Sequence, residues 1–405
     1  MSLLVVHHAT GEPALHGAAA AALCKAIGAR LVHGPVGFDL ARHADAFQHV
    51  TRCGQLVASG LLWAERLGLD LSARSTADET VAAALAGDVV LAHRPGDPQS
   101  EDHLSEVTGL AGRAGVDMRH FAVRVPGEGA DLAVVGEASG AVLATVTRDR
   151  YGRVDMPLAD VSPKTGAVRI ALVGSEHDQR EAYPANIAAL ADAADALGLD
   201  LTLVFLDPKL QSADDFAQAA REVGGVLLPG GSDMGNVTGQ ILAAGAGLDA
   251  GLPTLGLCLG MQSMSTAVAR RTPGFEAANL EEADPDAPIK TFVPMAGTPG
   301  LPVYRLGEAT IRAQPGTRIA ALLGAAPTVL CNHRYRLAPG LVGPLDGSGL
   351  AVGATDATGG IVDAVEHRDH PFYTGMQGHP ELSSRRDAPH PLITAFVAAA
   401  AGRAS

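Results

Sequence analysis

The sequence predicts an α/β protein whose C-terminal part is a doubly wound, mostly parallel sheet, preceded by a smaller α/β domain. From residue 167 onward, short apolar runs alternate with segments of helical composition, which is typical of a parallel sheet covered by helices. The run "AVRIALVG" (167–174) is almost entirely apolar, as expected for a strand buried on both faces. Two glycine-rich stretches, "PGG" (229–231) and "GLCLG" (256–260), follow apolar runs and so fall at strand carboxyl ends, where such sheets bind ligands.

The elements of the larger domain follow one another in alternating order. After the strand at 167–174 we predict helices over 183–199, 213–223, 239–251 and 261–271, and strands over 201–207, 224–231 and 253–258. The preceding stretch "PLADVSPKTG" (157–166) combines proline, glycine and polar residues. We take it as the domain boundary, which gives domains of residues 1–160 and 167–405.

The smaller domain is also predicted to mix strands and helices. A strand is predicted over 3–8 and a helix over 14–29. Further strands are predicted near 88–93 and over 116–125, 131–136 and 141–149, with a turn at 126–131. Ser75 and Thr76, with Asp78 and Glu79 close behind, are capping-box candidates for a helix start.

Composition limits the classes of function. The 405 residues carry a net charge of −14, which gives no support for a nucleic-acid partner. No apolar stretch is long enough for a membrane span, and the N-terminus lacks the basic start of a signal peptide. Four cysteines are scattered singly, so neither a zinc site nor a disulfide scaffold is expected. We expect a cytoplasmic protein with reduced thiols.

Cys258 is the candidate nucleophile. It follows a predicted strand and precedes a predicted helix, so a sharp turn would lift its thiol out of the sheet. Gly256 and Gly260 would allow the tight backbone and close helix–strand packing, and the helix N-terminus would favour a thiolate. The alternative is a buried structural cysteine, because free cysteines are among the most buried residues.

A cysteine nucleophile needs a base and a group that orients it. The segment "GMQGHPELSSRR" offers His379 and Glu381, whose side chains would project to the same side of an extended segment. A metal site is the rival interpretation of this pair, but further ligands at suitable spacing are missing. We therefore expect no metal and no cofactor.

These motifs together resemble the class I glutamine amidotransferases, in the version found at the C-terminus of CTP synthase. That family reads P-x-L-G-I-C-L-G-M-Q and later Q-x-H-P-E-x-x-S-R-P, and the resemblance covers about residues 167–403. It implies that Cys258 attacks the carboxamide of L-glutamine to form a γ-glutamyl thioester and ammonia. His379 would transfer protons and Glu381 would orient it. Backbone N–H groups of Gly231 and Leu259 would hold the oxyanion.

The resemblance also implies residues that hold glutamine. Gln262 matches the glutamine of "CLGMQ", Glu282 in "ANLEEADP" would meet the α-amino group, and Arg334 in "NHRYR" would face the α-carboxylate. Gly230 in "PGG" is expected to bind the substrate together with these residues. Each assignment has an alternative. Gln262 would be an ordinary helix residue, Glu282 a solvated loop carboxylate and Arg334 part of a surface salt bridge.

The sequence also departs from the family. Only about 165 residues precede the glutaminase part, and no G-x-x-x-x-G-K-[ST] phosphate loop is present, so we do not expect a complete CTP synthase. "ANLEEADP" loses the small polar centre of its motif, and Gly378 stands where the family usually has an aromatic residue.

The residues before 165 resemble no family, and their many histidines could simply be surface or core residues. The turns "HHATGE" (7–12) and "AHRPGD" (92–97) follow predicted strands and are candidates for an acceptor pocket.

Three functions follow from these observations. The first is a glutamine amidotransferase that supplies ammonia to an unknown acceptor, held by residues 1–160 or by a separate synthase subunit. The second is a stand-alone hydrolase of glutamine or of another γ-glutamyl amide. The third is a degenerate regulatory domain, against which the intact set Cys258, His379 and Glu381 argues. We expect no nucleic acid and no membrane as partners, and homo-oligomerisation stays open.

Overall fold

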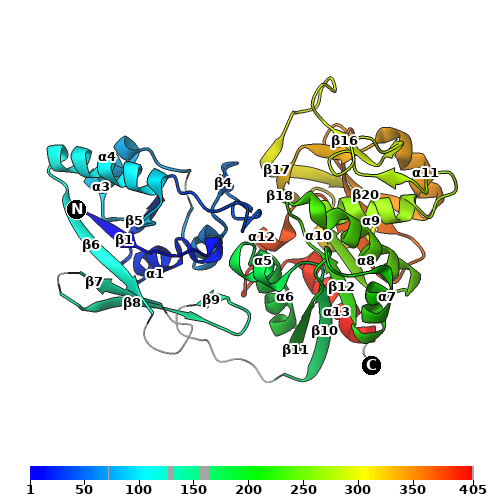
Figure 1. Cartoon of the computed structure of the whole chain (residues 1–405), viewed down its shortest axis with the longest axis horizontal. Helices are drawn as coiled ribbons and strands as arrows, with labels where there is room; N and C mark the ends of the chain where they lie inside the picture. The colour runs from blue at the N-terminus through cyan, green and yellow to red at the C-terminus, as the bar shows by residue number, and fades with distance from the viewer. Residues whose placement is uncertain (72, 126–131, 138, 156–163, 404–405) are drawn as a thin grey trace. The chain divides into compact units, whose positions relative to one another are not determined.

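The computed structural model describes residues 1–71, 73–125, 132–137, 139–155 and 164–403. The chain divides into two compact units, of which the first contains Met1–Val161 and His177–Ala188, and the second contains Ser162–Glu176 and Ala189–Ser405. Figure 1 traces the first sheet in blue to cyan and the second sheet from green to red. Each unit is described by itself below.

The first unit is built on a seven-stranded mixed sheet with the order β2-β5-β1-β6-β7-β8-β9. The strands β2, β5, β1 and β6 run parallel, and β7, β8 and β9 continue antiparallel. The strands are β1 (Ser2–His7), β2 (Arg30–His33), β5 (Val89–His93), β6 (Asp117–Arg124), β7 (Leu132–Gly136), β8 (Val142–Arg148) and β9 (Val154–Asp155), with the small ribbon β3 (His49–Val50) and β4 (Leu56–Val57) beside them.

Helices cover both faces of this sheet. Alternate residues of β1 point to opposite faces, so Leu4 and Val6 pack with α1, whereas Leu3 and Val5 pack with α3 and α4. The helices are α1 (Ala18–Ile27), α2 (Leu62–Arg66), α3 (Ala77–Ala86) and α4 (Pro98–Ala114), with the short 3₁₀ turns η1 (Pro13–Leu15) and η2 (Ser59–Leu61). The core of this unit therefore lies in two layers, one on each side of the parallel strands.

The second unit is built on a nine-stranded sheet with the order β11-β10-β12-β13-β22-β21-β20-β17-β18. Its first five strands are parallel and the remaining four are antiparallel. The strands are β10 (Gly166–Leu172), β11 (Leu199–Phe205), β12 (Gly225–Leu228), β13 (Thr254–Leu257), β17 (Arg305–Ala313), β18 (Thr328–His333), β20 (Leu350–Asp356), β21 (Val362–His367) and β22 (Tyr373–Met376). The pairs β14 (Ala278–Asn279) with β15 (Ile289–Lys290), and β16 (Phe292–Pro294) with β19 (Tyr335–Leu337), form small separate ribbons.

Helices flank this second sheet as well. They are α6 (Ala185–Ala196), whose residues from Ala189 onward belong to this unit, α7 (Ala213–Glu222), α8 (Val237–Asp249), α9 (Leu259–Ala269), α10 (Arg318–Leu323), α11 (Val342–Gly347), α12 (Pro380–Ser383) and α13 (Pro391–Arg403), with the turns η3 (Met234–Asn236) and η4 (Pro339–Leu341). The short helix α5 (Glu176–Glu181) precedes them in the chain. By contacts, the residues from His177 to Ala188 belong to the first unit. One apolar core unites α8 and α9 with β12 and includes Ile241, Met264 and Leu228.

The predicted fold class is confirmed: a large, mostly parallel sheet follows a smaller α/β unit. The capping box is formed by Thr76, whose hydroxyl accepts from the Glu79 N–H while the Glu79 carboxylate accepts from the Thr76 N–H. Helix α4 was not predicted, although Asp97 as its cap and Pro98 at its first position are typical start signals. The predicted turn at 126–131, and residues 157–163 of the predicted boundary, lie outside the described residues.

Within the described part of the chain, none of the helices has the length and apolar character that crossing a membrane requires.

Candidate active site

Cys258 lies between the end of β13 and the start of α9, as the sequence predicted. Its φ of 48° is the only positive value of a non-glycine residue in the described part of the chain. Such backbone strain is typical of a nucleophile held on a sharp turn. The flanking glycines are required by packing, because a Cβ on Gly260 would lie 2.0 Å from the Leu228 carbonyl oxygen and one on Gly256 would lie 2.6 Å from the Met264 sulfur.

His379 and Glu381 lie side by side in the interior of the second unit. His379 Nδ1 is 2.7 Å from Glu381 Oε1, and the two side chains are 1% and 0% exposed. Since a carboxylate only accepts, Nδ1 carries the proton, which leaves Nε2 for proton transfer. The local conformation differs from our prediction: the segment is not extended, because Pro380–Ser383 forms the short helix α12 and His379 is its N-cap. The side chains meet across the first helical turn.

The imidazole of His379 also lies close enough to the nucleophile to interact with the side chain of Cys258. Burial alone would lower the pKa of His379, but the charges of Glu381 and Cys258, with the hydrogen bond to Glu381, raise it well above its usual value. A protonated imidazole beside the sulfur stabilises a thiolate. The three side chains therefore have the arrangement that a nucleophile, a proton carrier and an orienting carboxylate need.

Two further groups touch the sulfur. Cys258 Sγ lies 3.7 Å from the main-chain oxygen of Asn332, and the Gln377 side-chain amide donates to Sγ at 3.5 Å. Sequence reasoning missed both residues. Asn332 comes from β18 and Gln377 directly follows β22. Both stand in quoted motifs, Asn332 in "NHRYR" and Gln377 at the start of Q-x-H-P-E, but no role was assigned to either.

The glycines that follow β12 lie against His379 and Cys258. A Cβ on Gly230 would be 3.1 Å from Cε1 of His379 and 3.3 Å from Cβ of Cys258, so the backbone approaches the reacting groups closely. Gly231 has a φ of 153°, which other residues rarely adopt. Leu259 is the first residue of α9, where backbone N–H groups have no partner within the helix.

Gln262 lies on the buried side of α9, one turn beyond the nucleophile, and is 4% exposed. Its amide nitrogen is 3.5 Å from Oε1 of Gln377, whereas its own Oε1 is buried and has no hydrogen-bond partner. Burying a carbonyl oxygen without a hydrogen-bond donor costs free energy, so Oε1 of Gln262 is suited to accept a hydrogen bond from a ligand.

Glu282 and Arg334, the proposed zwitterion holders, are close enough to interact. Both side chains are exposed. Neighbouring atoms nevertheless desolvate the Glu282 carboxyl and raise its pKa, against the opposing charge of Arg334. The guanidinium of Arg334 stacks over the Tyr304 ring, 4.3 Å from its centre, and the Tyr304 hydroxyl donates to Asn332 Oδ1 at 2.5 Å. Tyr304 was not among the residues predicted from the sequence.

Gly378 fits tightly where it stands. A Cβ at this position would lie 3.0 Å from Cβ of Val329 and 3.1 Å from the Leu330 oxygen. This close packing against β18 explains why the residue before His379 is a glycine here rather than an aromatic residue.

The other cysteines differ from Cys258. Burial raises the pKa of Cys24 and of Cys331 to about 12, so both thiols stay protonated. Cys53 is exposed in the first unit.

Comparison with known proteins agrees with this geometry. The model of the family "Glutamine amidotransferase class-I" matches residues 180–399, which is more than half of the chain. The chain belongs to the class-I glutamine amidotransferase family. The match includes the cysteine elbow, the histidine–glutamate pair and both glycines after β12.

Relatives of this amidotransferase include CTP synthases. The chain is 35% identical to the CTP synthase of Roseiflexus castenholzii over 260 residues, which is 63% of this chain and 46% of that protein. It is 34% identical to the CTP synthase of Thermus thermophilus over 243 residues, 58% of this chain and 44% of that protein. The chain thus spans about half the length of these relatives.

A solved structure shares the fold. The glutaminase domain of the Trypanosoma brucei CTPS, determined with bound acivicin, superimposes with a TM-score of 0.55 at 27% identity. The superposition covers 58% of this chain and 94% of that domain.

The first unit gathers histidines that the sequence shows only as scattered residues. His7 Nδ1 is 2.9 Å from His93 Nδ1, and His7 Nε2 is 2.8 Å from His120 Nδ1. The chain of rings continues to Glu101, whose carboxylate is 3.6 Å from His93 Nε2. The rings come from the neighbouring parallel strands β1, β5 and β6, in which His7 pairs with His93 and His120 lies opposite Val5.

A second group in the first unit has the composition of a cation site. One ligand atom each of His43, His177 and Glu181 lies within 4.8 Å of the others. The sequence did not predict this group. The Arg42 guanidinium is 3.4 Å from the same Glu181 carboxylate, and the two imidazole rings stack at 5.1 Å. A cation therefore already pairs with the carboxylate, and we assign no metal there.

Proposed function

We propose that this chain hydrolyses L-glutamine through a thioester on Cys258 and delivers the ammonia to an acceptor. The observation that carries the proposal is the cluster of Cys258, His379 and Glu381, in which the nucleophile sits on a strained turn and the neighbouring imidazole is hydrogen-bonded to a buried carboxylate. The thiolate attacks the carboxamide carbon, and the C–N bond breaks as His379 gives its proton to the leaving ammonia. Water, deprotonated by the same imidazole, then attacks the thioester carbon, and the C–S bond breaks to release glutamate and restore the Cys258 thiolate.

The oxyanion formed in both steps needs donors. The N–H groups of Gly231 and Leu259 are proposed for this role, supported by the close approach of the "PGG" turn to the nucleophile and by the free N-terminus of α9. Gly230 allows that approach. Gln262, Glu282 and Arg334 are proposed to hold the substrate, with the buried Oε1 of Gln262 as one acceptor and the opposite charges of the other two for the zwitterion ends.

The acceptor is proposed to bind in the first unit or on a separate synthase subunit. We propose further that the chain is not a complete CTP synthase. Binding in the first unit is supported by the turns 7–12 and 92–97, which the sequence marked as candidates for an acceptor pocket, because His8 and His93 from these turns line the same pocket. The four cysteines are unpaired, and we place the chain in the cytoplasm as part of this proposal. The competing proposal is a hydrolase without an acceptor.

The test uses the whole chain with Cys258→Ala and, as matched controls, Cys24→Ala and Cys53→Ala. Ammonia release from glutamine is expected to vanish in the first variant alone. A γ-glutamyl electrophile such as diazo-oxo-norleucine is expected to add one label, located at Cys258 by mass spectrometry. Wild-type rates in Cys258→Ala would refute the mechanism. Stimulation of the wild-type rate by a cell extract would favour the acceptor over simple hydrolysis.

A further inference from the structure

The carboxyl edge of the first sheet has the topology of a ligand site. Strands β1 and β5 are neighbours, yet the chain leaves β1 for α1 on one face and leaves β5 for α4 on the other. The two connections therefore separate at this edge and open a crevice between them. In open α/β sheets, ligands bind at such points.

Histidines line a closed pocket in this crevice, which as it stands has no room for a water molecule. Its walls are His8, His16, Gly17 and His93, together with apolar residues of β1, β5 and α1. His16 is 2% exposed, and Nδ1 of both His8 and His16 is buried without a hydrogen-bond partner. A neutral imidazole can place its proton on either nitrogen, so each of these atoms can donate to a ligand.

The position of His16 is fixed by the surrounding backbone. The turn η1 that precedes it is held by Trp63, whose Nε1 donates to the Ala14 oxygen at 2.6 Å. A Cβ on Gly60 would lie 2.5 Å from the His16 oxygen, so the chain passes this residue in contact. The orphaned Nδ1 atom is thus held in place rather than left on a mobile loop.

Arg94 is the permanent cation that acts on the His16 imidazole. Burial lowers the pKa of His8 and His93 to about 4 and that of His16 to about 3, so these rings are neutral at pH 7 and each can donate one proton to an anion. Helix α1 starts at the pocket with Gly17 as its N-cap, so no side chain caps its first N–H groups.

Other charges lie further along the edge. Arg148 acts on His8, and Glu12 is 3.6 Å from the same guanidinium. On the α4 side, Glu101 and Asp97 act on His93, and Asp97 already accepts the Ser100 N–H. These carboxylates face His93 and Arg148, and Asp97 also lies 3.9 Å from the Arg94 guanidinium. The groups acting on His16 are Arg94 and imidazole rings.

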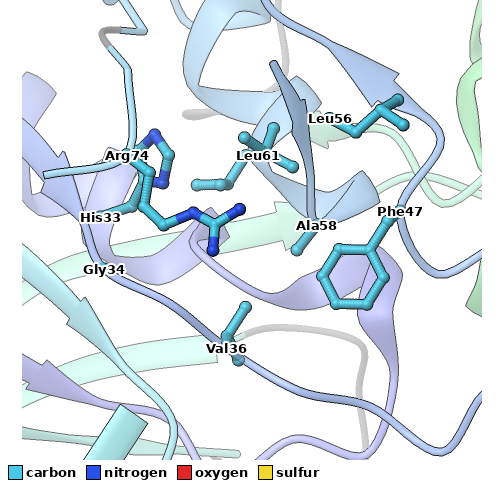
Figure 2. Close-up of a pocket in the computed structure, with 9 residues that line it drawn as sticks. His33, Gly34, Val36, Phe47, Leu56, Ala58, Leu61 and Arg74 are labelled. Atoms are coloured by element: carbon cyan, nitrogen blue, oxygen red, sulfur yellow. The ribbon is translucent and has the colours of Figure 1, made fainter. Parts of the chain in front are cut away.

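A second pocket adjoins the first. Figure 2 shows the Arg74 guanidinium extending over Val36, Phe47 and Leu61 in a pocket that also includes His33. Leu61 separates the two pockets, because its Cδ2 lies 2.5 Å from the place where a Cβ of Gly17 would stand.

We propose that the crevice between β1 and β5 binds the phosphate or carboxylate group of a small molecule, with His16 and His8 as donors and the N-terminus of α1 behind them. Because the pocket as it stands has no room for a water molecule, the group enters only when the half-buried ring of His8 turns with it. That this molecule is the ammonia acceptor rests on the proposed function, whereas the anion site does not.

The experiment is calorimetric titration of the whole chain with inorganic phosphate and, separately, with malonate. We expect saturable binding of at least one anion with one site per chain, and the anion that binds identifies the group as phosphoryl or carboxylate. His16→Gln is expected to weaken binding at least tenfold, since a hydrogen bond to a charged group is lost. His8→Gln provides a second test if His16→Gln does not fold.

Arg30→Ala is the matched control, because it removes an exposed cation from the opposite edge of the same sheet and should leave binding unchanged. Malonate titrations in two buffers of different ionisation enthalpy should show proton uptake, as the anion stabilises imidazolium. Absence of saturable binding of both anions, or equal binding by wild type and both histidine variants, would overturn the proposal. Titration of Cys258→Ala separates this result from glutamine hydrolysis, because the anion should still bind.

Discussion

His379 Nδ1 lies 2.7 Å from Glu381 Oε1 in the core of the second unit, where neither side chain is more than 1% exposed. This pair fixes the tautomer of the imidazole and leaves Nε2 free of that bond for the chemistry at Cys258. Because both groups are buried, the carboxylate acts on the ring without screening by water.

Glu381→Gln should therefore reduce turnover more than binding. We expect kcat to fall by about 10²-fold or more, the usual scale of an acid–base contribution, while KM changes little. The amide also removes a charge that raises the pKa of His379, so the basic limb of the pH–rate profile should move to lower pH. Steady-state ammonia release between pH 6 and 10 measures both effects. An unshifted profile would show that Glu381 does not control the imidazole.

Arg334→Ala should weaken glutamine binding by removing the cation proposed for the α-carboxylate. The loss of a charge-assisted contact costs about 1.5–3 kcal/mol, which corresponds to at least a tenfold rise in KM. The matched substrate is 4-aminobutanamide, which lacks the carboxylate and should be affected much less. Equal losses with both substrates would contradict the assigned contact, and Glu282→Gln provides the complementary test at the amino group.

Tyr304→Leu should act through Arg334. The ring holds the guanidinium at 4.3 Å, and a partly exposed cation–π contact contributes about 0.5–1 kcal/mol, so KM should rise about two- to fivefold. Tyr304→Phe keeps the ring and should preserve KM. Tyr151→Leu is the control, since Arg150 stacks on that ring at 4.7 Å in the first unit. If Tyr304→Phe were as defective as Tyr304→Leu, the hydroxyl bond to Asn332 would be the important contact instead.

His16 should make the chain sensitive to acid. Burial, with the charges of nearby basic groups, lowers its pKa to about 3, below the ordinary value of 6.5 in the unfolded chain. The unfolded state therefore binds the proton more readily between these values, and stability is lost as the pH falls below 6.5. The loss from this one residue approaches 1.4 kcal/mol per pH unit.

In His16→Gln the free energy of unfolding should consequently fall less steeply with decreasing pH. Urea denaturation at pH 7.5, 6.5 and 5.5, followed by circular dichroism, gives the slopes to compare. Parallel slopes for variant and wild type would show that His16 is not held neutral.

The second unit was largely predictable because its signals are local. The alternation of apolar runs and helices gave the parallel strands, and Gly256, Cys258 and Gly260 marked the elbow within five residues. The contact of His379 with Glu381 was anticipated, although through the wrong local conformation, since Pro380 starts a helix rather than continuing a strand.

The remaining parts depend on contacts between distant residues. Asn332 and Gln377 reach Cys258 from 74 and 119 positions away, and no spacing rule connects them. The His7 ring meets His93 and His120 at separations of 86 and 113 residues, only because β1, β5 and β6 are neighbouring parallel strands. Single histidines in a sequence do not show which strands will become neighbours.

The hydrogen bond from Trp63 to the Ala14 oxygen has a spectroscopic consequence. Trp63 is the only tryptophan in the chain, it is 1% exposed, and it holds the turn that presents His16. The indole emission of the entire protein therefore originates beside the histidine crevice. The wavelength and lifetime of this emission therefore report on that turn without an attached dye. The second unit contributes no tryptophan of its own to the signal.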